Sequence, residues 1–375
     1  MIPLNEKLTA LQPSAIRSFT ALAKQTPDCV LLTLGEPDFD TPQPIKEALY
    51  AAVRSGQTHY APNAGTEALR SAIADYETGR GYACTAEDVL VTVGATGALY
   101  TALTGILNPG DEVVVPTPAF PLYESIVKAA GANYVPMDTS KDGFQLTGET
   151  LSAHITPNTK AIVLNSPNNP TGVVYSRASL EAVKAAVLGK PIFVICDNVY
   201  GQLVKGDCPD LSCDPQLKEQ VLLCQSFSKP YAMTGWRAGY LAAPAWVMDR
   251  LRLLHAANVA CVPTFVQAAC QAALKTDVSA MAESYAARRS YVCSRLEKMG
   301  LSFPEPAGAF YVFAKIPEKD STQFCTRLIR EAKVALVPGS CFGAEGYVRI
   351  SCCCSEAALR TGMDRLEQYI KERKV

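Results

Sequence analysis

The sequence has very little histidine, with only three such residues among 375. This argues against a histidine-rich metal site and against a serine–histidine–aspartate triad. Fourteen cysteines are present, but no Cys-x-x-Cys pair occurs, and Cys352, Cys353 and Cys354 are consecutive. On a strand, consecutive side chains point to opposite faces, which makes joint metal ligation awkward. We therefore predict no bound metal, and we interpret the cysteines as reduced core residues.

Neither sign of charge dominates, because 35 basic residues face 36 acidic ones and the formal net charge is -1. This balance argues against nucleic acid or an acidic membrane surface as a partner. The chain also lacks any run of about 18 apolar residues that would span a membrane. Its first 19 residues include Glu6, Lys7 and Arg17, and cannot supply the apolar region of a signal peptide. We predict a cytoplasmic protein without membrane contact.

Short runs of apolar and β-branched residues alternate with helical patterns through the first two thirds of the chain. The runs are Val89–Val93, Val113–Val115, Ala161–Leu164, Ile192–Cys196 and Val221–Cys224. Continuous apolar runs of this length are typical of strands buried on both faces of a sheet. Helix candidates lie between them, for example over 66–78, with Thr66 as a cap, and over 179–188. The pattern predicts an α/β fold with a largely parallel sheet covered by helices on both sides.

The pattern changes after about Pro263. A long helical stretch follows over 265–299, then strand-like runs at 310–313, 334–337 and 347–351, and a final helix over about 356–371. A chain of 375 residues exceeds the size at which one core usually stops growing. We therefore predict a large domain over 46–262 and a smaller α+β domain over 263–375. The N-terminal arm, 1–45, is expected to belong in part to the smaller domain.

Lys229 follows two serines, Ser226 and Ser228, and Arg237 stands eight residues further on. An amine close to two hydroxyl groups, with a guanidinium nearby, can hold an aldehyde cofactor covalently while its phosphate is bound. Pyridoxal 5'-phosphate (PLP) is such a cofactor. Taken alone, an ordinary surface loop is the commoner explanation of this segment, so the hypothesis depends on residues elsewhere.

A turn of small residues, Gly94-Ala95-Thr96-Gly97, follows the first apolar run and opens a helical pattern. Free backbone N–H groups and the positive end of a helix dipole suit a phosphate, and Thr96 adds a hydroxyl group. A merely tight strand-to-helix turn is the alternative. The turn lacks the Gly-x-Gly-x-x-Gly pattern of dinucleotide folds, which argues against a hydride-transferring dehydrogenase.

Asp197 ends the run at 192–196. In open α/β sheets, ligands bind at the carboxyl ends of the strands, and a carboxylate there can hold a pyridine nitrogen protonated. Such an aspartate can equally bind magnesium in a nucleotide hydrolase, but the Gly189-Lys190 pair lacks the spacing of a phosphate loop. Tyr200 can direct its phenol at the O3' oxygen of the same ring, with aromatic packing as the alternative.

Two further candidates are Asn169 and Arg349. Asn169 lies in the segment 168–172, which reads as a turn on composition, although its amide can also donate to O3' and to a carboxylate. Arg349 is a charge inside the otherwise apolar strand pattern at 347–351. Its planar fork suits a bidentate α-carboxylate, and an internal salt bridge is the alternative.

Taken together, these segments resemble the fold type I PLP-dependent enzymes, specifically the class I/II aminotransferases. The resemblance extends over nearly the whole chain and includes Leu34–Phe39, Tyr60–Gly65 and Gly235–Arg237. The order and spacing of the segments are highly specific. The resemblance implies a large cofactor-binding domain, PLP as the cofactor and a homodimer with shared active sites.

The resemblance also implies a role for each matched residue. Lys229 corresponds to the lysine that holds the cofactor and moves the proton, Asp197 to the partner of the pyridinium nitrogen, and Tyr200 to the phenol on O3'. The other implied cofactor contacts are Ala95, Thr96, Phe120, Asn169, Ser226, Ser228, Arg237 and, from the neighbouring subunit, Tyr60. The implied receivers of the substrate α-carboxylate are Gly35, Asn169 and Arg349. One position departs from the family pattern: Asn198 stands where a glutamate is usual, which questions local packing more than chemistry.

The predicted function is therefore amino group transfer from an L-amino acid to a 2-oxo acid by a ping-pong mechanism. The overall likeness is to the branch that holds aspartate, aromatic and acetyl-diaminopimelate aminotransferases, and the sequence leaves the substrate pair open. A PLP-dependent carbon–sulfur β-lyase is the alternative within the same cofactor class. A non-enzymatic sensor would need an added DNA-binding module, and the sequence shows no basic helix-turn-helix.

Overall fold

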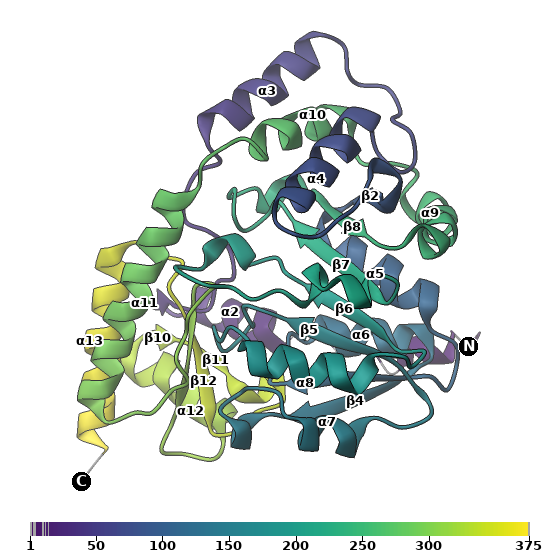
Figure 1. Ribbon diagram of the computed structural model, residues 1–375. Coiled ribbons are helices and arrows are strands. Elements are labelled where there is room, and N and C mark those ends of the chain that lie inside the picture. The colour runs from purple at the N-terminus through teal and green to yellow at the C-terminus, as the bar shows by residue number, and fades with distance from the viewer. Residues whose placement is uncertain (1, 3–4, 10, 12, 14, 374–375) are drawn as a thin grey trace.

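A seven-stranded sheet forms the centre of the structure, a computed structural model that describes residues 2, 5–9, 11, 13 and 15–373 (Figure 1). Its strands are β2 (Val89–Thr92), β3 (Glu112–Thr117), β4 (Asn133–Asp138), β5 (Thr159–Asn165), β6 (Phe193–Asp197), β7 (Val221–Ser226) and β8 (Gly239–Ala242). They lie in the order β2-β8-β7-β6-β5-β3-β4. Strand β8 runs antiparallel to both of its neighbours, and the other pairs are parallel. The predicted α/β fold with a mostly parallel sheet is confirmed.

The two faces of this sheet are buried under different sets of helices, because side chains alternate along each strand. In β6, Val194 and Cys196 belong to one hydrophobic cluster and Ile195 to the other. The first cluster includes residues of α3 (Gln43–Arg54), α4 (Glu67–Gly79), α7 (Gly148–His154), α8 (Arg177–Val187) and α10 (Thr264–Ala273). The second includes residues of α5 (Gly94–Ile106), α6 (Leu122–Ala130) and α9 (Ala245–Val259). Within the described residues, no helix has the length and apolar character that crossing a membrane requires.

Hydroxyl side chains cap two of the predicted helices at their N-termini. Thr66 accepts a hydrogen bond from the backbone of Leu69 at the start of α4, as predicted. Ser176 does the same for α8 by accepting from the backbone of Ser179, and this helix begins at Arg177, two residues earlier than expected. Such caps satisfy N–H groups that have no partner inside the helix.

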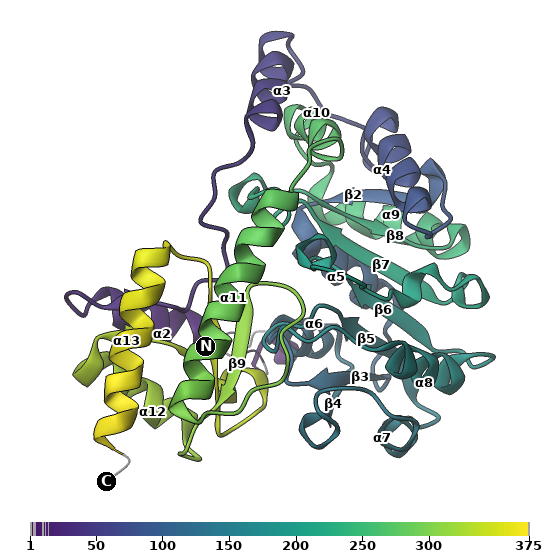
Figure 2. The same cartoon turned by 60° about the vertical axis from the view of Figure 1, so that its left-hand side comes forward.

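A second, smaller group of elements lies beside the large sheet (Figure 2). It contains a three-stranded antiparallel sheet of β11 (Val337–Pro338), β12 (Tyr347–Ser351) and β9 (Tyr311–Lys315), and the helices α11 (Ser279–Met299), α12 (Ser321–Arg327) and α13 (Glu356–Glu372). The short strand β1 (Val30–Leu31) pairs in parallel with β10 (Val334–Ala335), which ties the N-terminal segment to this group. Two further N-terminal helices are α1 (Glu6–Thr9) and α2 (Ala15–Lys24). The division at 45/46 and 262/263 stays a prediction, and residues 1, 3, 4, 10, 12 and 14 of the predicted arm, with 374 and 375, lie outside the described part.

Two predictions for the C-terminal part were wrong in detail. The helical stretch predicted over 265–299 is two helices, α10 and α11, and α10 packs into the core of the large sheet. The break occurs where Asp277 accepts hydrogen bonds from the backbone and hydroxyl of Ser279, which starts a new helix. The strand predicted over 334–337 is also divided, because β10 pairs with β1 whereas β11 pairs with β12.

Candidate active site

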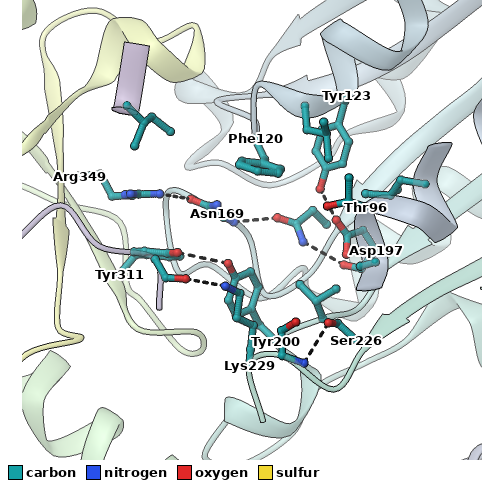
Figure 3. Close-up of a pocket in the computed structure, with 18 of the residues that line it drawn as sticks. Thr96, Phe120, Tyr123, Asn169, Asp197, Tyr200, Ser226, Lys229, Tyr311 and Arg349 are labelled. Atoms are coloured by element: carbon teal, nitrogen blue, oxygen red, sulfur yellow. Dashed lines mark hydrogen bonds between the residues drawn. The ribbon is translucent and has the colours of Figure 1, made fainter. Parts of the chain in front are cut away.

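A cavity of about 230 Å³ lies where β5, β6 and β7 reach their carboxyl ends and face β12 (Figure 3). All of the predicted site residues except Tyr60 line it: Gly35, Ala95, Thr96, Phe120, Asn169, Asp197, Tyr200, Ser226, Ser228, Lys229, Arg237 and Arg349. These residues come from segments far apart in the sequence. The end of a largely parallel sheet brings them together, as the general rule for ligand sites in α/β folds predicts.

Lys229 lies in the loop that follows β7. Its Nζ donates a hydrogen bond to the backbone oxygen of Gly35 at 2.5 Å. Burial lowers the pKa of the Lys229 amine to about 8, and the nearby cations Arg237 and Arg349 lower it further against the opposing effect of Cys353 and Glu36. With this pKa, roughly a tenth of the amine is uncharged at pH 7, far more than for an ordinary lysine, so it can act as a nucleophile and as a base.

Asp197 ends β6 and is 4% exposed. The phenol of Tyr123 donates a hydrogen bond to its Oδ2 at 2.5 Å, whereas its Oδ1 is buried and has no hydrogen-bond partner among the described residues. Burial raises the pKa of Asp197 to about 6, although the Tyr123 hydrogen bond, the backbone of Val199 and the charge of Lys229 oppose this change. A buried carboxylate oxygen without a partner is costly, so the geometry suits a cationic donor from a ligand.

The N-terminus of α5 provides an anion site at one end of the cavity. Val93 precedes the helix and supplies no capping side chain, so the first N–H groups are left for another acceptor. Ala95, Thr96 and Arg237 all line the cavity here. Gly94 has φ of 66°, and a Cβ at this position would lie 2.8 Å from Nη2 of Arg237. Glycine is therefore required both by the backbone and by the guanidinium beside it.

Arg349 lies on β12 and is 2% exposed. Its Nη1 donates to Oδ1 of Asn169 at 2.8 Å and its Nη2 to the backbone oxygen of Thr33 at 2.9 Å. The guanidinium carbon lies 4.3 Å from the ring centre of Tyr311 and 4.9 Å from that of Phe342. No carboxylate forms an ion pair with Arg349 in the described part of the chain, and its buried Nε has no partner. The internal salt bridge that the sequence left open is thus absent from the described residues, and the cation faces the cavity.

A chain of hydrogen bonds connects Arg349 with Asp197 through two asparagines (Figure 3). The backbone N–H of Asn169 donates to Oδ1 of Asn165 at 2.8 Å, and Nδ2 of Asn165 donates to the backbone oxygen of Asp197 at 2.9 Å. Asn165 thereby fixes the loop that carries Asn169 against the end of β6. Sequence reasoning missed Asn165, although it directly follows the predicted run at 161–164 and so lies at the carboxyl end of a strand, where ligands bind.

Other lining residues were also missed: Ile16, Leu99, Leu122, Tyr123, Val199 and Tyr311. The hydroxyl groups of Tyr200 and Tyr311 are 3.2 Å apart, and an edge-to-face contact joins Phe120 to Tyr123 at 6.0 Å between ring centres. Nothing in the local sequence marks these tyrosines as site residues. Their position depends on how α6, which carries Tyr123, packs on the large sheet and on where the small sheet places β9, which carries Tyr311.

Two predicted or discussed residues do not face the cavity. Tyr60 is 91% exposed and lies outside the cavity of its own chain. The side chain of Asn198 donates to Oδ2 of Asp210 at 2.6 Å and is not part of the cavity lining. The departure from the family pattern at Asn198 therefore concerns packing behind Asp197.

Comparisons with known proteins point in one direction. The family model for aminotransferases of class I and II matches residues 27–366. The chain is 40% identical to the probable N-acetyl-LL-diaminopimelate aminotransferase of Bacillus subtilis, over 99% of this chain and 96% of that protein. It is 37% identical to aromatic-amino-acid aminotransferase 2 of Thermococcus litoralis, over 99% of each chain. The crystal structure of aspartate aminotransferase from Thermotoga maritima superposes with a TM-score of 0.93 at 35% identity, covering 98% of this chain and all of that one.

Proposed function

The chain belongs to the class I and II aminotransferases, and from this membership we propose that the cavity moves an amino group from an L-amino acid to a 2-oxo acid by a ping-pong mechanism. The protein is a PLP-dependent transaminase. One observation carries the assignment of the site: the Lys229 amine, the Asp197 carboxylate and the Arg349 guanidinium line the same cavity. No described carboxylate forms an ion pair with Arg349, so the guanidinium is available to a substrate.

The residues around the cavity fit PLP. The partnerless Oδ1 of Asp197 suits a protonated ring nitrogen, and the N-terminus of α5 with Thr96 and Arg237 suits the phosphate group. When bound, PLP supplies an aldehyde that reacts with amino groups and a ring that withdraws electrons from the substrate carbon. We assign Ser226, Ser228 and Ala95 to the phosphate, Phe120 to the ring face, and Tyr200 with Asn169 to O3', as the resemblance implies.

Lys229 is proposed to hold the cofactor and to move the proton at the substrate Cα. Its low pKa supports this role because the free amine is available near neutral pH. Asp197 is buried and its Oδ1 has no hydrogen-bond partner among the described residues, so this oxygen is proposed to place a negative charge beside the ring nitrogen. Because Asp197 is buried away from bulk water, its attraction to a protonated ring nitrogen would be stronger than in solution.

Arg349, Asn169 and the backbone of Gly35 are proposed to bind the substrate α-carboxylate. The planar guanidinium of Arg349 can donate to both oxygens of a carboxylate. The rings of Tyr311 and Phe342 hold this guanidinium in place. Asn169 already accepts from Arg349, so its amide is oriented before substrate arrives. This preorganisation reduces the entropy lost when the substrate binds.

The names of the relatives define which amino donors to test first. They are called aminotransferases of N-acetyl-LL-diaminopimelate, of aromatic amino acids and of aspartate. We propose that the physiological donor belongs to one of these groups. The carbon–sulfur β-lyase alternative is not favoured, because these relatives and the family model are aminotransferases.

We further propose that two copies of the chain share their active sites. The support is Tyr60, which the resemblance assigns to the phosphate of the neighbouring subunit and which is exposed in a single chain. Tyr100 on α5 and Leu253 on α9 are large hydrophobic residues that are also exposed, at 40% and 63%. A cytoplasmic location stays a prediction from the sequence.

The experiment that tests the site assignment is a half-reaction. Purified protein loaded with PLP is mixed with each amino donor in the absence of a 2-oxo acid acceptor. We expect one equivalent of the corresponding 2-oxo acid per site and loss of the absorbance of lysine-bound PLP, with neither change in Lys229→Ala. Continuous release of pyruvate and ammonia from a cysteine conjugate would instead support the lyase, and normal turnover by Lys229→Ala would refute the assignment of Lys229.

A further inference from the structure

Residues 35–41, which we call the bridging segment, form hydrogen bonds with Lys229 and with the residues that follow it. The backbone oxygen of Gly35 accepts from Lys229, and Thr41 Oγ1 donates to the backbone oxygen of Ala232 at 2.6 Å. A carboxylate oxygen of Glu36 accepts a hydrogen bond from the hydroxyl of Thr234. One side of the bridging segment is therefore joined to the part of the chain that carries the reactive amine.

Asp38 joins the other side of the bridging segment to α11. Nη1 of Arg288 lies 2.8 Å from Oδ1 and 2.9 Å from Oδ2 of Asp38, and the hydroxyl of Tyr285 donates to Oδ1 at 3.1 Å. The same Nη1 donates to the backbone oxygen of Cys352 at 3.2 Å. The side chains of Arg288 and Asp38 are only 11% and 24% exposed, so water screens this ion pair less than a surface pair.

Aromatic rings restrict the Arg288 guanidinium from two directions. Its carbon lies 5.3 Å from the ring centre of Phe39 and 5.4 Å from that of Tyr285. The two rings are themselves in edge-to-face contact at 5.5 Å. An arginine held in this way has little rotamer freedom left to lose, so it is a rigid anchor for Asp38.

We propose that the ion pair between Asp38 and Arg288 positions the reactive amine, by holding the Gly35 carbonyl in the place where it accepts from Lys229. This inference rests on the proposed role of Lys229. Only two residues, Glu36 and Pro37, lie between Gly35 and Asp38, so a displacement at Asp38 is expected to move Gly35 as well. Asp38 and Arg288 do not line the cavity, and they act as positioning residues. A displacement of about 1 Å at a reacting group can cost roughly a hundredfold in rate.

The position of the bridging segment is expected to affect the pKa of Lys229, which can be measured. Burial is the largest cause of the low pKa of the amine, and the other groups that influence it are Cys353, Glu36, Arg237 and Arg349. When the bridging segment is released, water reaches the amine and relieves the effect of burial, which is larger than the opposite effect of losing Glu36. The pKa of Lys229 is then expected to rise toward that of an ordinary lysine.

The test compares Asp38→Asn, Arg288→Gln and the double variant with the matched control Asp40→Asn. Asp40 lies in the same stretch, its side chain is fully exposed, and its carboxylate is 3.9 Å from Lys46. PLP is added to cofactor-free protein at a series of pH values, and the rate of its attachment to Lys229 is followed by absorbance. The PLP-loaded proteins are then assayed for kcat and KM, and thermal unfolding is recorded for each. Asp38→Glu, which keeps the carboxylate, serves as the rescue variant.

We expect the pH midpoint of PLP attachment to rise in Asp38→Asn and Arg288→Gln, and kcat to fall about tenfold with little change in KM, because only the reacting geometry is disturbed. The double variant should be no worse than either single variant, since both remove one interaction. Asp38→Glu should recover part of kcat, and Asp40→Asn should behave as wild type. Unchanged midpoints with lower thermal stability alone, or additive losses in the double variant, would overturn the proposal. The attachment assay needs no amino donor, so a failure of transamination is distinguishable from a failure of this inference.

Discussion

The phenol of Tyr123 donates to Oδ2 of Asp197 at 2.5 Å and leaves Oδ1 of the same carboxylate buried without a partner. One oxygen is therefore oriented by the protein, and the other is available to a ligand. Because α6 carries Tyr123 and β6 carries Asp197, the packing of the helix on the sheet sets the direction of the free oxygen. This arrangement prepares the carboxylate for a ring nitrogen before any cofactor binds.

Replacement of Tyr123 by phenylalanine is expected to weaken both PLP binding and turnover. A hydrogen bond to a charged group contributes about 1.5–3 kcal/mol, so kcat should fall at least about tenfold and the Kd for PLP should rise. Equilibrium titration with PLP and steady-state kinetics measure the two effects. Tyr50→Phe is the control, because Tyr50 is 54% exposed on α3. Equal kinetics in the two variants would show that Asp197 needs no support from Tyr123.

Asp197→Asn is expected to change how the stability of the cofactor-free protein depends on pH. The carboxyl has a pKa of about 6 when folded and an ordinary value of 3.8, so the folded state binds more protons between these values. Its contribution to the free energy of unfolding is therefore greatest below pH 4 and decreases as the pH rises to 6, by about 3 kcal/mol. Asparagine does not titrate, so the variant should lose less stability than wild type between pH 4 and pH 7.

Chemical denaturation of both cofactor-free proteins at several pH values measures this difference. The same Asp197→Asn protein should bind PLP weakly and show almost no turnover, because the ring nitrogen loses its anionic partner. A variant that follows the pH profile of wild type would mean that Asp197 is ionised at no cost inside the fold. Addition of PLP should stabilise wild type much more than the variant.

Arg349→Gln is expected to raise KM for amino acid donors about a hundredfold, because a bidentate, charge-assisted interaction with the α-carboxylate is lost. Amine donors without a carboxylate should be affected little. Arg295→Gln is the matched control, since Arg295 forms ion pairs with Asp364 and Glu367 on α13, away from the cavity. Removal of Arg349 leaves no described carboxylate without its partner, but it takes a donor from Asn169 Oδ1 and from the Thr33 backbone oxygen, so thermal unfolding is recorded to check that the variant is folded. A fall in kcat with unchanged KM would contradict the proposed role.

Local patterns in the sequence account for much of the fold. The apolar runs became five strands of the large sheet, and Thr66 caps α4, because burial on both faces and helix capping depend on nearby residues. The break between α10 and α11 was missed because the hydrogen bonds from Ser279 to Asp277 involve two short polar side chains inside a helical pattern, which is a weak signal. The choice between β1 and β12 as strand partners is set by tertiary packing, so the division of the strand at 334–337 could not be predicted.

The site shows the same limit. Asp197 could be predicted because ligands bind at the carboxyl ends of strands. Tyr123, which donates to Asp197, is 74 positions away in the sequence, and no such rule identifies it. Arg349 could be recognised as a charge in an apolar strand, but its lack of a carboxylate partner required the structure. Contacts between distant segments depend on how helices pack on the sheet, and no short sequence pattern encodes them.

Tyr60 gives a test of shared active sites that needs no structure of the assembly. Tyr60→Asp places a carboxylate where the resemblance puts the phosphate of the other subunit, so like charges should repel and the variant should be nearly inactive. Lys229→Ala should also be inactive. In a mixed dimer of the two variants, one site receives an intact Lys229 and an intact Tyr60, and the other site receives neither.

Equal mixing by joint refolding should therefore restore about a quarter of wild-type activity, since half of the dimers are mixed and each has one functional site of two. Mixing Tyr60→Asp with a Tyr60→Asp/Lys229→Ala double variant is the control, and it should restore nothing, because no subunit then supplies Tyr60. Light scattering checks that each variant has the mass of two chains. If mixing the single variants restored no activity although mixed dimers had formed, Tyr60 would act on its own subunit or not at all.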